Sequence, residues 1–152
     1  MKGLIASALC LGAAASQANP MTVGIDPCSD IKGPMIDMIA EPWEDHSALF
    51  YDGKVRMAVI SQHLSEALAI ISPPYDDGGR AQCKILGRNL PISRLDFANH
   101  VADYNTEDGL IVSMPFLQYH DTDDLGIIEI PDGNLVVILN PTTGALTYRT
   151  DQ

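Results

Sequence analysis

The segment from Tyr119 to Gly126 has the residue types that come closest to a defined chemistry. It reads Tyr-His-Asp-Thr-Asp-Asp-Leu-Gly. Asp121, Asp123 and Gly126 fall at positions one, three and six of a calcium-binding loop, where carboxylates supply the oxygen ligands and glycine makes the sharp turn. The spacing of these three residues therefore suggests calcium binding as the first function to consider.

The same loop departs from the calcium pattern at two ligand positions. Leu125 stands at position five, and Asp132 stands at position twelve where a bidentate glutamate belongs. We therefore predict a solvated acidic loop. We also expect that its carboxylates bind calcium at most weakly, in the range of about 10⁻⁴–10⁻³ M. These carboxylates belong to Asp121, Asp123 and Asp124. A second acidic loop, Tyr75 to Gly79, is a weaker candidate.

Four histidines could each act as a general base, because imidazole titrates near neutral pH. They are His46, His63, His100 and His120. None has a recognisable nucleophile or partner close to it in the sequence. Motifs of serine hydrolases, zinc proteases, dinucleotide-binding and phosphate-binding loops and haem attachment are missing. The sequence predicts no catalytic residue and no cofactor, and we interpret the histidines as surface or structural side chains.

Aromatic side chains are the candidates for ligand contact. Trp43, the single tryptophan, stands among acidic residues. It either packs over the edge of the core or stacks on a ligand. A binding module should expose an aromatic or apolar patch, and we expect it around Trp43, Tyr75 or Tyr119. A small hydrolase should instead show a histidine in a concave pocket beside serine or aspartate.

The first eighteen residues have the parts of a secretory signal peptide. Lys2 supplies the positive charge, Leu4 to Ala15 is the apolar segment, and Ser16 to Ala18 offers small residues for cleavage. The apolar segment is too short to span a bilayer. We therefore expect residues 1–18 to be removed and residues 19–152 to form a single exported domain, periplasmic or secreted.

Two cysteines, Cys28 and Cys83, remain after this removal. An even count in an exported chain predicts one disulfide between them. Metal ligation by the pair is the alternative, but no C-x-x-C spacing supports it.

The chain is acidic, with a net charge of -11. This charge disfavours nucleic acids and anionic membrane surfaces as partners and favours solubility. Neither insertion of the mature chain in a membrane nor binding of nucleic acid is expected. The expected partner is another exported protein or a small ligand.

Short apolar runs separated by turn residues predict the elements of the first half. We expect a strand over 20–25, one or two helical turns within 28–40, and a hairpin at Asp52-Gly53 that pairs Phe50 with Val55. Residues 55–71 also show helical spacing, but their β-branched residues favour strands over 54–60 and 67–72. A strand over 81–86 follows. Residues 91–104 should begin as a helix, capped by Ser93 and Asp96, and end extended.

The stretch from Gly109 to Arg149 reads as an antiparallel meander of three or four strands. Turns are predicted at 131–133 and 140–144, with Ile128 pairing with Val137 and Leu139 with Leu146. Both turns would place one set of side chains on a common face, namely Ile128, Ile130, Leu135, Val137, Leu139, Leu146 and Tyr148. The loops 105–109 and 140–144 share a spacing, in which asparagine opens each loop and glycine closes it.

These elements together predict a β-dominated α+β fold. We expect an antiparallel meander sheet, or a small sandwich, with one or two short helices. The favoured function is a non-enzymatic binding or structural module, the alternatives being a small secreted hydrolase and a calcium-stabilised module.

Overall fold

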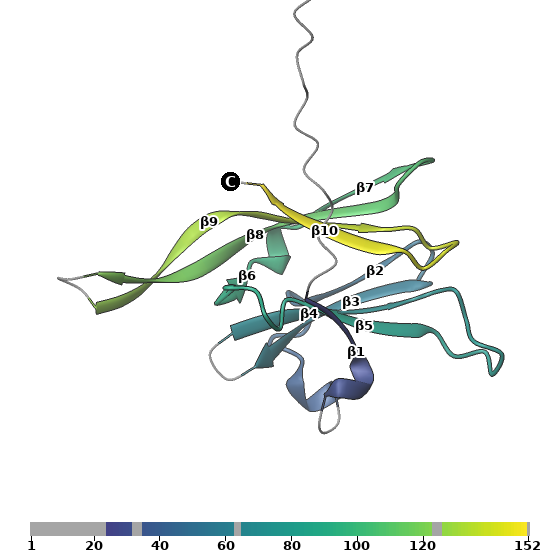
Figure 1. Ribbon diagram of the computed structural model, residues 1–152, viewed down its shortest axis with the longest axis horizontal. Helices are drawn as coiled ribbons and strands as arrows, with labels where there is room; N and C mark the ends of the chain where they lie inside the picture. The colour runs from purple at the N-terminus through teal and green to yellow at the C-terminus, as the bar shows by residue number, and fades with distance from the viewer. Residues whose placement is uncertain (1–23, 32–34, 63–64, 123–125, 152) are drawn as a thin grey trace, which may run out of the picture.

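The chain forms two antiparallel β-sheets (Figure 1). The computed structural model describes residues 24–31, 35–62, 65–122 and 126–151. The first sheet has the order β1-β5-β4-β3-β2, formed by β1 (Ile25–Pro27), β5 (Gln82–Leu86), β4 (Ser65–Ser72), β3 (Val55–Gln62) and β2 (Ser47–Phe50). The second sheet contains β10 (Leu146–Asp151), β9 (Gly126–Leu139) and β8 (Gly109–Thr122), with β6 (Arg94–Leu95) and β7 (Val101–Asn105) both beside β8. The β-dominated antiparallel prediction is confirmed.

The helical content differs from the prediction. In the described residues the helical segments are three short 3-10 turns, η1 (Cys28–Asp30), η2 (Met35–Met38) and η3 (Phe97–Asn99), with no α-helix. The turns η1 and η2 agree with the one or two helical turns predicted within 28–40. Cys28 is tied to β5, and Ile39 forms a bridge with Ile60 of β3, so the described part of this segment has little room for a longer helix. No helix in this described part is long and apolar enough to cross a membrane.

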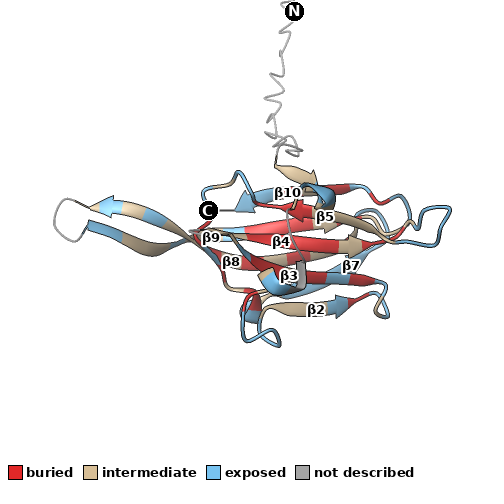
Figure 2. Cartoon of the chain, turned by 90° about the horizontal axis from the view of Figure 1, so that it is seen from below, coloured by how far each residue is buried: buried red, intermediate tan, exposed pale blue. Residues whose placement is uncertain are grey.

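One apolar core lies between the two sheets. Side chains from both sheets belong to the same buried cluster, among them Val55, Met57, Leu68, Leu110, Val112, Met114, Leu135 and Val137. The buried residues recur at every second position along β8 and along β3 as far as Val59, as expected for strands with one covered face. Figure 2 shows the buried positions concentrated in the central strands.

A second, smaller cluster covers the outer face of the first sheet. Ile60, Ala67, Ala69 and Ile85 pack there against residues of the segment 28–39. The Cys28–Cys83 disulfide joins this segment to β5, with its Cα atoms 5.3 Å apart. The predicted disulfide is therefore present, and it fixes the covering segment to the sheet.

The first-sheet strands confirm the predicted hairpin. Phe50 pairs with Val55 and Ala48 pairs with Met57. Residues 54–60 and 67–72 are strands, but β3 and β4 continue further than expected and pair up to Gln62 and Ser65. The connection left between the two predicted strands, residues 61–66, was therefore too long, because Ser61 pairs with Glu66 and Gln62 with Ser65. The predicted strand over 20–25 falls largely outside the described residues.

The stretch 91–104 also differs from the prediction. It begins as the short strand β6, continues as the turn η3 and ends as β7. Only the extended end is confirmed. The Ser93 hydroxyl does not cap a helix: it donates a hydrogen bond to the Leu117 carbonyl at 3.0 Å. Pairing of this stretch with β8 outweighs the local capping signal.

The last meander contains three antiparallel strands, as the prediction of three or four allows, but it lacks one of the two predicted turns. The 140–144 turn is confirmed, and Leu139 pairs with Leu146. The 131–133 turn is wrong, because β9 runs without interruption from Gly126 to Leu139. Ile128 pairs with His120 of β8, and Val137 pairs with Val112.

The residues 131–133 form an irregularity within a strand instead of a turn. Phe116 pairs with Gly133 and Leu117 with Pro131, so Asp132 is an extra residue in the β8–β9 ladder. Proline is tolerated here because β10 pairs with β9 only from Asn134 onward, which leaves Pro131 on an edge. The turn-like composition therefore marks a bulge.

Beyond this bulge, β8 and β9 extend away from the core as a two-stranded arm, residues 117–122 and 126–131 (Figures 1 and 2). None of the described arm residues is buried. The predicted common face therefore holds for Leu135, Val137, Leu139, Leu146 and Tyr148, which are buried, but not for Ile128 and Ile130. A single face cannot stay covered once the ribbon has left the opposing sheet.

Candidate functional site

Three loops meet at the end of the molecule opposite the arm, and two of them have the same construction. Asn105 Oδ1 accepts hydrogen bonds from the backbone N–H groups of Glu107 and Asp108. Asn140 Oδ1 accepts them from Thr142 and Thr143. The asparagine chemistry that the sequence predicts for both loops is therefore present.

Both closing glycines have a positive φ, and one of them, Gly109, allows the two loops to approach each other. Gly109 has φ +87° and Gly144 has φ +71°, a region that glycine adopts without steric cost. A Cβ atom on Gly109 would lie 2.6 Å from the Leu139 carbonyl oxygen and 3.0 Å from Pro141 Cδ. Only glycine at this position lets the 105–109 loop pack directly on the 140–144 loop.

The third loop is the β2–β3 turn, and it carries an unusual backbone conformation. Tyr51 and Asp52 have φ values of 53° and 54°, followed by Gly53 at 77°. A left-handed conformation is uncommon for a bulky residue and costs about 1–2 kcal/mol. Such strain persists where the surrounding structure holds it, and it is concentrated at binding and catalytic sites.

Tyr104 of β7 holds Tyr51 in this conformation. The Tyr51 N–H donates a hydrogen bond to the Tyr104 hydroxyl at 2.8 Å. The two rings lie with centroids 6.3 Å apart and an interplanar angle of 29°. The Lys54 ammonium lies 5.5 Å from the centre of the Tyr51 ring. The pair thus links an edge of the first sheet to an edge of the second.

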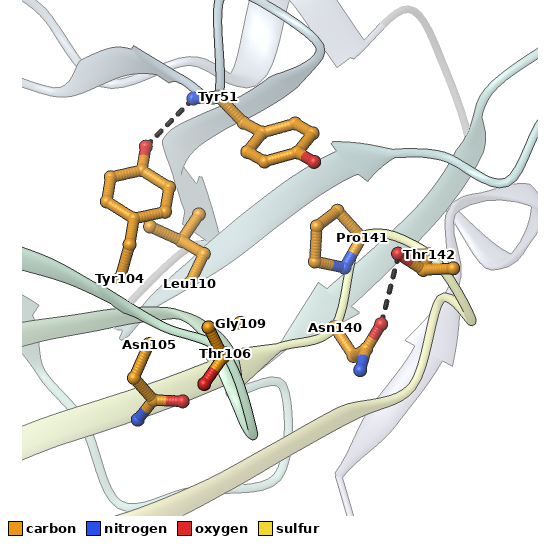
Figure 3. Close-up of a pocket in the computed structure, with 9 residues that line it drawn as sticks. All are labelled: Tyr51, Tyr104, Asn105, Thr106, Gly109, Leu110, Asn140, Pro141 and Thr142. Carbon is orange, nitrogen blue, oxygen red and sulfur yellow. Dashed lines mark hydrogen bonds between the residues drawn. The ribbon is translucent and has the colours of Figure 1, made fainter.

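These loops enclose a pocket of about 250 Å³, which we call the tyrosine pocket (Figure 3). Its lining consists of Tyr51, Tyr104, Asn105, Thr106, Gly109, Leu110, Asn140, Pro141 and Thr142. None of these residues carries a charge, although the chain has a net charge of -11. The lining itself therefore offers uncharged groups, while two charged side chains lie next to it: Lys54 beside the Tyr51 ring, and Asp108, which accepts a hydrogen bond from Asn105 Nδ2 at 3.0 Å.

A second pocket, of about 350 Å³, lies near the base of the arm. We call it the acid–base pocket, because Asp45, His46, Arg94 and Asp96 line it together with Leu95, Phe97, Ala98 and Leu117. The carboxylate of Glu66, in β4, accepts a hydrogen bond from the Leu95 N–H at 2.7 Å. Burial raises the pKa of Glu66, while the Leu95 hydrogen bond and the charges of His46 and Arg94 oppose the rise.

No nucleophile is aimed at His46 from the neighbouring serines. His46 Nδ1 lies 2.8 Å from the Pro42 carbonyl oxygen. The hydroxyl of Ser47 donates to the Trp43 carbonyl at 2.7 Å, and that of Ser93 donates to Leu117. The pocket thus has the histidine-beside-aspartate arrangement expected of a hydrolase, but neither serine supplies a nucleophile there.

Of the remaining histidines, the structure describes His100 and His120, which lie on different elements. His100 stacks on Phe97 with ring centroids 4.7 Å apart, and its edge meets Phe50. His100 is therefore a structural residue, as interpreted. His120 lies on the arm, and its Nε2 atom is buried without a hydrogen-bond partner among the described residues. His63 lies outside the described residues.

In the described part of the chain, no group of three or more histidine, cysteine, aspartate or glutamate side chains could hold a metal ion. Asp123 and Asp124 lie outside it, so weak calcium binding at 121–124 stays a prediction. Asp76 accepts hydrogen bonds from Gly78 and Arg80, and these bonds lower its pKa. The 75–79 loop is thus closed on itself.

The aromatic residues singled out by the sequence are exposed but do not form one surface. Trp43 is 62% exposed, Tyr75 54% and Tyr119 48%. Trp43 therefore does not pack over the core. Sequence reasoning missed Tyr51 and Tyr104, although each directly adjoins a recognised turn, at 52–53 and at 105–109. The turns were visible in the sequence, but their meeting across two sheets was not.

Comparison of the chain with protein-family models, with curated proteins and with solved structures finds no match. The site must therefore be interpreted from its own geometry.

Proposed function

We propose that this protein is a small exported, non-enzymatic binding module of the β-sandwich type, which binds a small ligand in the tyrosine pocket. The observation that carries the proposal is the Tyr51–Tyr104 pair. A strained tyrosine from one sheet is held over a pocket by a tyrosine from the other. Aromatic residues with a few placed polar groups are typical of small-molecule sites.

Export is supported by the signal-like segment 1–18 and by the disulfide, since disulfides persist in oxidising compartments. The ligand must then be met in the periplasm or outside the cell. The acidic charge favours partners other than nucleic acids and anionic membranes.

Backbone amide shifts in ¹⁵N-labelled protein test the proposal. The probes are small neutral sugars, short blocked peptides and small alcohols, each added in turn. We expect at least one class to shift the amides of 105–109 and 140–144 together with Tyr51. Shifts confined to other surfaces, or no shifts with any probe, would contradict the proposal.

The acid–base pocket supports a second candidate function, a small hydrolase. The specific observation is Glu66, a half-buried glutamate with a raised pKa that accepts a hydrogen bond from Leu95 of the pocket lining. Carboxyls with perturbed pKa values are common at catalytic sites. Hydrolysis of ester and glycoside reporter substrates tests it. A turnover that Glu66→Gln abolishes and Glu107→Gln leaves intact would favour this function over binding alone.

A further inference from the structure

The charge of the lining indicates what kind of ligand the tyrosine pocket takes. All nine lining residues are uncharged. The two charges next to the lining already face protein groups, Lys54 the Tyr51 ring and Asp108 the Asn105 amide. An ionised ligand would lose hydration against an uncharged lining, which is costly. The lining therefore favours a neutral ligand.

The polar atoms of the lining show that the ligand is also rich in hydrogen-bonding groups. Asn140 Oδ1 is occupied by the loop backbone, but its Nδ2 has no partner among the described residues. The hydroxyls of Thr106 and Thr142 likewise have none there. Tyr104 uses its oxygen as an acceptor toward Tyr51, which leaves its own proton to donate. These neutral donors and acceptors suit ligand hydroxyls, which can do both.

The two tyrosine rings favour a ligand that also has a flat apolar face. Tyr51 and Tyr104 both line the pocket, and the two residues are 43% and 48% exposed. Figure 3 shows both rings beside the pocket, above the two asparagine loops. A saccharide ring combines an apolar face of C–H groups with hydroxyls at its rim, so it can contact an aromatic ring and hydrogen-bond sideways at once.

The volume sets the size of the ligand. About 250 Å³ is below the roughly 300–1,000 Å³ of pockets for drug-sized molecules. The pocket therefore holds one ring and not a buried chain of them.

We infer that the tyrosine pocket binds one neutral sugar ring, with the ring face against a tyrosine and hydroxyls toward Asn140 and the two threonines. This inference rests on the proposed binding function and names its ligand class.

Saturation-transfer and ¹⁵N shift measurements on the full mature chain test the inference. The probes are glucose, galactose, mannose and N-acetylglucosamine, with glucuronate as the charged counterpart of glucose. We expect at least one neutral sugar to shift the 105–109 and 140–144 amides, and glucuronate to bind at least tenfold more weakly than glucose if glucose is that sugar. Glucuronate binding as tightly as the best neutral sugar would overturn the inference.

Two variants localise the effect. Asn140→Asp keeps the oxygen that holds the loop but replaces the free amide by a charge, so sugar affinity should fall at least tenfold. Tyr51→Gly removes the ring yet suits the left-handed backbone, so it should weaken binding while the protein stays folded. The matched control Tyr75→Gly, in an exposed loop, should bind as the original protein does. Unchanged affinity in both pocket variants would overturn the inference.

The outcomes separate the inference from the proposed function. If no sugar binds but a neutral peptide or alcohol shifts the same amides, the sugar inference is wrong and the binding function stands. If no probe shifts those amides, both are wrong.

Discussion

The backbone N–H of Tyr51 donates a hydrogen bond to the Tyr104 hydroxyl at 2.8 Å, across the gap between the two sheets. Tyr51 lies in the turn that joins β2 to β3, and Tyr104 lies in β7. Strands β2 and β7 are each at the edge of their sheet. The bond therefore fixes how the β2–β3 turn and the 105–109 loop face each other, which determines the shape of the pocket.

Tyr104→Phe should remove the hydrogen bond from the Tyr51 N–H while leaving the packing of the core unchanged. The Tyr51 N–H loses its acceptor, which should lower the free energy of unfolding by about 0.5–1.5 kcal/mol, measured by urea denaturation. The matched control is Tyr119→Phe on the exposed arm, where we expect no change. An equal loss in both variants would show that the Tyr51 bond contributes nothing.

Gly109→Ala should destabilise the protein more than Gly53→Ala. Both positions have a positive φ, so both variants bear the cost of a left-handed alanine, about 1 kcal/mol. At Gly109 the new Cβ also meets the Leu139 carbonyl, whereas at Gly53 nothing lies within 4 Å. Denaturation of the two variants isolates the steric contribution of the loop contact. Equal losses would mean that the 105–109 and 140–144 loops can separate freely.

The local sequence predicted well those hairpins in which the turn residues and the apolar alternation indicate the same register. The Phe50–Val55 and Leu139–Leu146 registers follow from turn residues and alternation acting together. The turn predicted at 131–133 rested on the same kind of turn residues, but it was wrong because β9 pairs with β8 on both sides of Pro131. The pairing of β9 with a long β8 gains a full ladder, so the Pro-Asp-Gly sequence becomes a bulge. A choice between turn and bulge depends on the partner strand, which local sequence does not contain.

The candidate site was harder to predict than the fold for a similar reason. The asparagine loops were identified from their spacing, since their hydrogen bonds are local. The tyrosine pair brings together residues 51 and 104, whose contact depends on how two sheets pack. Glu66 likewise meets Leu95 only because β4 lies against β6. Long-range pairs of this kind have no signature in a single sequence.

Replacement of both cysteines, Cys28→Ser with Cys83→Ser, should lower the free energy of unfolding by about 2–4 kcal/mol, because the bridge spans 55 residues. The loss should be accompanied by faster amide exchange in 28–39, the segment that covers the outer face of the first sheet. Amides in β8 should keep their relative protection. Titration of the oxidised mature protein should find no free thiol, and two free thiols would contradict the bridge.

Glu66→Gln should change how stability depends on pH. Burial raises the pKa of Glu66 in the folded protein above its ordinary value of 4.5. The folded state then holds this proton more tightly than the unfolded state, so the original protein loses stability as pH rises from about 4.5 through the folded pKa. Glutamine carries no proton to lose and still offers an oxygen to the Leu95 N–H. The stability of the variant relative to the original should therefore increase across this pH interval, in parallel urea denaturations. The exposed Glu107→Gln serves as control and should show no such trend. If the relative stability of Glu66→Gln instead falls with rising pH, the hydrogen bond and the charges of His46 and Arg94 outweigh burial, and the carboxylate is held in its ionised form.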